Sequence, residues 1–88
     1  MQKSVNRHIG SNPEMDDVDH ALGRPRNPLG ETYRNHYCAP GESGVAKRMS
    51  ESYWWHAART INGGKDIIFV VTKAGRQALA DFLVATKA

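Results

Sequence analysis

Two β-prone runs joined by a short glycine-rich turn constrain this chain more than any other feature. The first run covers residues 53–61, and the second covers residues 66–72. Between them stands Asn62-Gly63-Gly64-Lys65. An Asn-Gly pair supplies the positive φ angles that a tight hairpin turn needs, and both runs are rich in aromatic and β-branched residues. The sequence therefore predicts a β-hairpin over residues 53–72.

An amphipathic helix is expected to follow the hairpin directly. Thr72 is a typical N-cap residue, and apolar side chains recur at helical spacing from residue 78 to residue 83. The second hairpin strand is apolar on both faces from residue 67 to residue 71, which indicates that both of its faces are covered. The side chains expected to be most buried are Ile67, Phe69, Val71, Leu79, Phe82 and Leu83.

The N-terminal part of the sequence predicts a tail followed by one helix. Residues 1–11 are polar and basic without periodicity, so we expect a flexible tail there. Asn12 and Pro13, followed by acidic residues, are typical of a helix start, and Gly23 suits its end. Residues 12–88 are expected to form a single domain.

Three further elements are expected before the hairpin. Prolines predict a loop over residues 24–30, and β-prone residues predict a short edge strand or a packed extended segment over residues 32–38. An apolar stripe that includes Met49 predicts a helix over residues 42–51. The whole chain then combines helices with an antiparallel hairpin, which is an α+β fold class.

Size and composition place this chain among small globular domains. Its 88 residues suffice for one domain, and 40% are hydrophobic and 24% charged, which is ordinary usage. The lone Cys38 cannot form an intramolecular disulfide. No apolar run approaches the length of a membrane span, and the N-terminus lacks the apolar core of a signal peptide. We therefore expect a cytoplasmic protein with no membrane partner.

Three stretches carry a resemblance to a known group. Arg34-Asn35-His36-Tyr37, the turn Asn62-Gly63-Gly64 and the ending FVVTKAGRQAL from residue 69 are similar to motifs of short phage- and prophage-encoded proteins. The same ending resembles that of winged-helix domains, in which the last wing strand passes into a helix through a Thr-x-x-Gly-Arg turn. The resemblance implies a small winged-helix-like domain of mobile-element origin. It implies no particular activity, and residues 42–51 remain as the only candidate recognition helix.

Basic residues in the middle of the chain suggest binding to nucleic acid. In a winged-helix arrangement, a helix enters the groove while the hairpin contacts the adjacent backbone, and cations on both contact phosphates. The net charge is only +3, so a weak and shallow salt-dependent affinity is expected. The candidate nucleic-acid-binding residues are Arg24, Arg26, Lys47, Arg48 and Lys65.

Successive aromatic residues suggest binding to protein as the alternative. Tyr53, Trp54 and Trp55 cannot all face inward in a strand, because alternate residues point to opposite faces. An exposed aromatic residue near Arg59 has the composition of an interface anchor. In this alternative the chain is an inhibitor from a phage or other mobile element that binds a host protein complex, such as a defence or transcription assembly.

Signals for catalysis, cofactors and metals are weak in this sequence. It contains no nucleophile elbow, paired-carboxylate motif or phosphate-binding glycine loop, so we expect no enzyme activity and no cofactor. His36 and Cys38 form one H-x-C pair, but no second pair of ligands has the spacing of a zinc site. We expect no bound metal, and instead a buried Cys38 beside a half-exposed His36.

Overall fold

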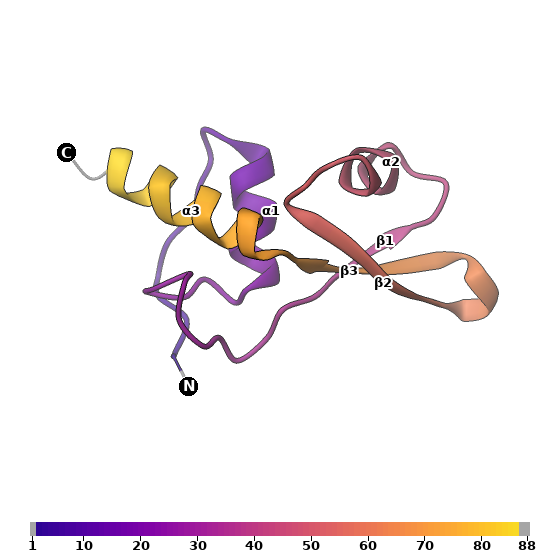
Figure 1. The fold of residues 1–88 in the computed structure, drawn as a ribbon, viewed down its shortest axis with the longest axis horizontal. Coiled ribbons are helices and arrows are strands. Elements are labelled where there is room, and N and C mark those ends of the chain that lie inside the picture. Colours follow the sequence, from indigo (N-terminus) through magenta and orange to yellow (C-terminus); the bar gives the residue numbers. More distant parts are fainter. Residues whose placement is uncertain (1, 87–88) are drawn as a thin grey trace.

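The central hairpin forms where the sequence predicts it. In the computed structural model, which describes residues 2–86, strands β2 (Trp55–Ile61) and β3 (Asp66–Val71) pair antiparallel. A single 3-10 turn, η1 (Asn62–Gly64), connects them, as Figure 1 shows at the tip of the hairpin. All three turn residues have positive φ, from 54° at Asn62 to 90° at Gly64. The turn thus uses the left-handed conformations that asparagine and glycine tolerate.

A third strand completes the sheet on the far side of β3. Strand β1 (Tyr37–Pro40) pairs antiparallel with β3, which gives the order β1-β3-β2 (Figure 1). The edge strand predicted over residues 32–38 is confirmed as an edge, but it begins later. The Asn35 side chain accepts from the Val71 amide at 2.7 Å and donates to the Val71 carbonyl at 3.0 Å. This side-chain amide replaces the backbone pairing that an earlier strand start would provide.

Three α-helices accompany the sheet, and each begins at a side-chain cap. They are α1 (Pro13–Ala21), α2 (Gly44–Ser50) and α3 (Lys73–Ala85). The caps Asn12, Ser43 and Thr72 each accept from a backbone N–H of the first turn, at 3.1 to 3.3 Å. The starts of α1 and α3 were predicted from their caps Asn12 and Thr72, and α2 lies within the range 42–51 that its apolar stripe predicted. No helix within residues 2–86 has the length and apolarity required to cross a membrane.

The core lies between one face of the sheet and the three helices. Trp55, Phe69 and Val71 supply the sheet side. From the helices and their flanks come Met15, Val18, Ala21, Leu22, Ala46, Met49 and Leu79. On the opposite face Ile68 and Val70 are only half-buried, between exposed Cys38 and exposed His56. The prediction that β3 is covered on both faces is therefore wrong for this outer face.

Burial along α3 also differs from the prediction. Leu79, Phe69 and Val71 are buried as expected, whereas Phe82 and Leu83 are only half-buried. The physical reason is that α3 continues away from the sheet after its first turns, as Figure 1 shows. Its last part has little to pack against, and Val84 is 74% exposed. Ile67 is also only half-buried, because it lies near the hairpin tip, at the end of the sheet away from α1 and α3.

The N-terminal segment, residues 2–11, lies along α1 and the loop after it. The Val5 amide donates to the Arg24 carbonyl at 2.8 Å, and Ile9 is 7% exposed within the core. A flexible tail was expected here, because the segment shows no periodicity. Its contacts come instead from single residues, each matched to a partner elsewhere in the fold.

Candidate functional site

Tyr53 stands out from the rest of the surface. The residue is 90% exposed, although the backbone around it is held at several points. The Thr72 hydroxyl donates to the Tyr53 carbonyl at 2.6 Å, and the Thr72 amide donates to the Trp54 carbonyl at 2.8 Å. The Trp54 amide in turn donates to the Ser52 hydroxyl at 3.1 Å. We call residues 52–54 the Tyr53 corner: a fixed backbone that presents an aromatic ring to solvent.

Close helix packing fixes the Tyr53 corner further. Gly75 in the first turn of α3 lies against Trp54, and a Cβ at this position would stand 2.6 Å from the Trp54 carbonyl oxygen. Only a glycine permits this approach of α3 to the turn before β2. The glycine of the Thr-x-x-Gly-Arg motif therefore has a packing role in this chain.

Of the three aromatic candidates for an interface anchor, the two tryptophans are not exposed. Trp55 is 8% exposed and makes edge-on ring contacts with Tyr37 and Phe69, with centroids 5.9 and 6.5 Å apart. Trp54 is half-buried and packs against the core. The aromatic residue left at the surface is Tyr53, because the strand begins only at Trp55 and the residues before it form a turn. Trp55 is thus a core residue and is not available to a partner.

Two of the five candidate nucleic-acid-binding residues are engaged by acids of α1. An Arg24 terminal nitrogen lies 2.9 Å from Asp16 and 3.0 Å from Asp19. Arg48, on α2, lies 3.4 Å from Asp17. The hydrogen bond to Asp16 raises the pKa of Arg24 further above its usual value. These cations are neutralised within the protein, and a phosphate would have to displace the carboxylates or lie beside them.

The other three candidates, Arg26, Lys47 and Lys65, are exposed and form no ion pair within residues 2–86. Lys65 follows the hairpin tip, and its carbonyl accepts from the Gly41 amide at 2.7 Å, which brings the tip beside the turn before α2. Arg26 lines a hollow with Thr86 at the far end of α3. Figure 1 places that end of α3 and the hairpin tip at opposite ends of the molecule. Arg26 and Lys65 therefore do not belong to one compact basic patch.

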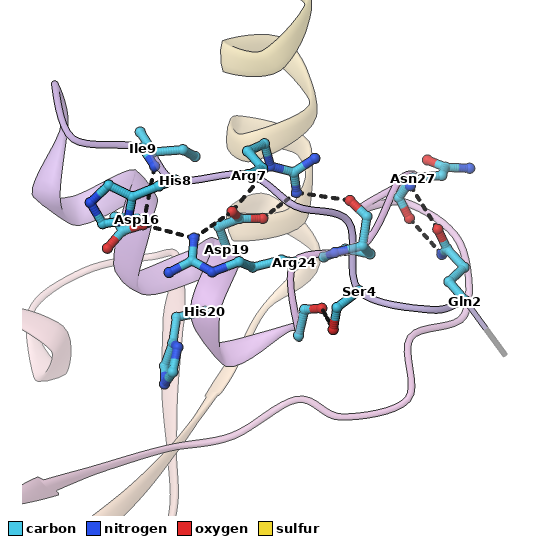
Figure 2. Close-up of polar contacts among 12 residues, drawn as sticks. Gln2, Ser4, Arg7, His8, Ile9, Asp16, Asp19, His20, Arg24 and Asn27 are labelled. Carbon is cyan, nitrogen blue, oxygen red and sulfur yellow. Dashed lines mark hydrogen bonds and ion pairs between the residues drawn. The ribbon is translucent and has the colours of Figure 1, made fainter.

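A buried ion-pair network is the main feature that the sequence did not reveal. The Asp19 side chain has no exposed surface, and it accepts from the guanidinium groups of both Arg7 and Arg24 (Figure 2). The Arg7 Nε atom lies 3.1 Å from the carboxylate, and a terminal nitrogen of Arg7 also reaches the Pro25 carbonyl at 2.8 Å. Arginine and aspartate 12 residues apart carry no local pattern, so only the fold brings them together.

Asp16 belongs to the same network at its exposed side. Partial burial by itself would raise the pKa of Asp16, but the hydrogen bonds from Arg24 and the Ile9 amide and the charge of Arg24 outweigh it. The net effect is a pKa below the usual value. The four charged groups of the network, Arg7, Asp16, Asp19 and Arg24, hold the N-terminal segment, α1 and the loop after α1 together, as Figure 2 shows.

A hollow of about 500 Å³ lies between α1 and the segment that leads into β1. Burial raises the pKa of Asp17. Burial also raises the pKa of Tyr37, and the negative charge of Asp17 raises it further. Cys38 is exposed here, so its predicted burial is wrong; as an outward residue of an edge strand it has no element above it. The residues that line the hollow are Asp16, Asp17, His20, Arg24, Arg34, His36, Tyr37 and Cys38.

Metal ligation finds no support in this hollow or elsewhere in residues 2–86. No three His, Cys, Asp or Glu side chains of that range are grouped in a way that could hold a metal ion. The arginines in the hollow are also poor neighbours for a cation. The hollow is thus a mixed-charge surface depression of the kind that neighbouring polar side chains often leave.

Comparisons with known proteins return no relative. No protein-family model matches the sequence, and neither the curated proteins nor the solved structures contain a match to it. The proposals below therefore depend on the geometry of this chain.

Proposed function

We propose that this chain is a small protein-binding domain, which inhibits or modulates a host protein complex by docking through the Tyr53 corner. The observation that carries the proposal is a 90% exposed tyrosine on a backbone held by three hydrogen bonds. Tyrosine offers a large contact area with few rotatable bonds, and interface hot spots are enriched in it. A fixed backbone lowers the entropy lost on binding.

Support for the rival function, nucleic-acid binding, is weaker. The candidate recognition helix α2 has only 7 residues, and its Arg48 is paired with α1. Glu14 and Asp17 stand beside that arginine and would repel a phosphate backbone. Exposed Lys47 and Lys65 favour nucleic acid, but they would supply only a shallow electrostatic affinity.

The fold proposal is a winged-helix-like domain of mobile-element origin. The order of the elements supports this proposal. Two helices precede the hairpin, β1 pairs with β3, and β3 leads into α3 through Thr72. Such a domain can serve as a scaffold for protein contacts as well as for DNA, since function depends on the residues that a fold presents.

The test is an affinity capture from a lysate of the host cell, made with and without nuclease, followed by titration of the captured protein. Tyr53→Ala should weaken that binding by about 2 kcal/mol or more, which is about thirtyfold, as loss of a central aromatic anchor does. Tyr33→Ala is the matched control, because Tyr33 is also exposed but packs over Gly23 and Arg34. Equal affinity of the two variants would contradict the proposal, and so would capture that disappears with nuclease.

A further inference from the structure

We propose that the free edge of β2 binds an extended, acidic segment of the partner, which adds a fourth strand to the sheet. This inference deepens the proposed function and rests on it, since the Tyr53 corner immediately precedes β2. The edge supplies backbone hydrogen bonds, and the corner supplies an aromatic anchor at one end of the same surface. Strand addition to a sheet edge is a common mode of peptide recognition.

The direction of the backbone groups of β2 follows from the pairing of β3. Both backbone groups of Val71 are taken by Asn35, which lies on the β1 side. Val71 therefore offers nothing to Trp55 opposite it, and the Trp55 amide donates instead to the Ser52 carbonyl at 3.3 Å. Because successive residues direct their N–H and C=O groups to opposite edges, Ala57 also points its backbone groups away from β3.

A β-bulge then changes this alternation. The register moves from Ala57 opposite Phe69 to Arg59 opposite Ile68, which leaves Ala58 as the extra residue. After the bulge, Thr60 is the residue whose backbone groups point outward. Ala57 and Thr60 thus present N–H and C=O groups to solvent along the edge of β2.

The outer edge of β2 is open along most of its length. Residues 56–60 are all exposed, and no backbone group from outside the β2–β3 pairing reaches them within residues 2–86. The other edge of the sheet is different: β1 has 4 residues, ends at Pro40 and is preceded by the Asn35 side-chain pairing. Short edges and prolines discourage strand addition. Any added strand would therefore select β2.

Charge identifies the chemistry of the occupant. Arg59 is the cation of β2, it forms no ion pair within residues 2–86, and β2 contains no acid. Lys65 stands just beyond the tip of the hairpin. Cross-strand pairs of opposite charge stabilise a sheet, and like charges opposed to each other destabilise it. The edge therefore fits a strand with carboxylates and disfavours a second copy of this chain, which would bring the same cations together. The bulge at Ala58 further limits the length of a symmetric pairing.

The experiment uses the full chain and a fluorescein-labelled peptide of alternating glutamate and valine, with a lysine–valine peptide as the charge control. Fluorescence anisotropy should show binding of the acidic peptide only. Ala57→Pro removes an outward N–H without taking a bond from β3, and it should weaken binding about tenfold or more, as loss of a backbone hydrogen bond does. Arg59→Glu should weaken it similarly. Ala57→Val and Arg59→Lys are the matched controls and should bind as the parent does.

Amide hydrogen exchange is a second measurement. It would not change if the peptide contacted only side chains of β2. The amides of Ala57 and Thr60 should exchange more slowly when the acidic peptide is bound. Unchanged exchange at both amides would overturn the proposal, and so would equal binding of the two peptides. A dimer of the parent that Ala57→Pro converts to a monomer would also overturn it, because a second copy would then occupy the edge.

The two proposals fail in different ways. If the captured partner loses affinity for Tyr53→Ala but not for Ala57→Pro or Arg59→Glu, the edge proposal is wrong and the Tyr53 corner stands. If the acidic peptide binds β2 while Tyr53→Ala leaves the captured partner's affinity unchanged, the edge is supported and the corner is not an anchor.

Discussion

Removal of the Asp19 carboxylate should destabilise this domain more than removal of any other charge on α1. The Asp19 side chain is completely buried, and the side chains of Arg7 and Arg24 are each only about one-fifth exposed. In Asp19→Ala both cations lose their buried partner, and the ties of the N-terminal segment to α1 and to the loop are weakened. Breaking a buried ion pair on one side costs about 3–5 kcal/mol, against a total stability of about 5–15 kcal/mol for a native protein.

Urea unfolding, followed by tryptophan fluorescence and by circular dichroism, measures this loss. Asp17→Ala is the matched control, because Asp17 lies on the same helix but its side chain is 24% exposed and its arginine partner is 46% exposed. A pair of that kind contributes about 1 kcal/mol or less. If Asp19→Ala lowers the free energy of unfolding no more than Asp17→Ala, the network does not stabilise the N-terminal segment as we argue. Coincident transitions by the two probes are required for the comparison.

Three further predictions concern single contacts. Gly75→Ala should lower the urea midpoint of unfolding, because the new Cβ would lie 2.6 Å from the Trp54 carbonyl oxygen. Gly44→Ala is the control: it has open space around it and should raise the midpoint, because alanine favours the helix more than glycine does. Asn35→Ala should speed hydrogen exchange at the Val71 amide and cost about 1–3 kcal/mol, and a slow amide would contradict the side-chain pairing. The pKa of Asp16 is lowered, so its contribution to stability is present above the unfolded pKa of about 3.9 and is lost as pH falls through the folded value. Asp16→Asn should therefore destabilise at pH 7 and converge with the parent in acid; a pH-independent difference would refute this.

Elements with a local signal were predicted well. The hairpin turn needs residues with positive φ, and Asn62, Gly63 and Gly64 are residue types that adopt positive φ readily. The helix starts at Asn12 and Thr72 were also correct, because a capping side chain acts within three residues of itself. Such signals need no knowledge of the rest of the fold.

Elements that depend on distant partners were predicted less well. The first strand was placed too early, since nothing local shows that the Asn35 side chain takes the place of a strand backbone. Phe82 and Leu83 have the spacing of a buried stripe, but spacing does not reveal where the sheet beneath a helix stops. The aromatic run was expected to leave at least one of its three rings facing away from the core, and the turn before β2 decides that the exposed ring is that of Tyr53.

The candidate site shows the same division. The sequence by itself determined that aromatic residues and a basic middle segment would stand near a hairpin, because residue type and order are enough for that. Only the tertiary structure decided that Arg24 and Arg48 are neutralised by α1 and that the N-terminal segment is held by Asp19. Ion pairs form between groups far apart in sequence, and the residues next to a charged side chain do not show which residue will pair with it. Burial is likewise a property of all the elements packed around a residue, so no window of sequence contains it.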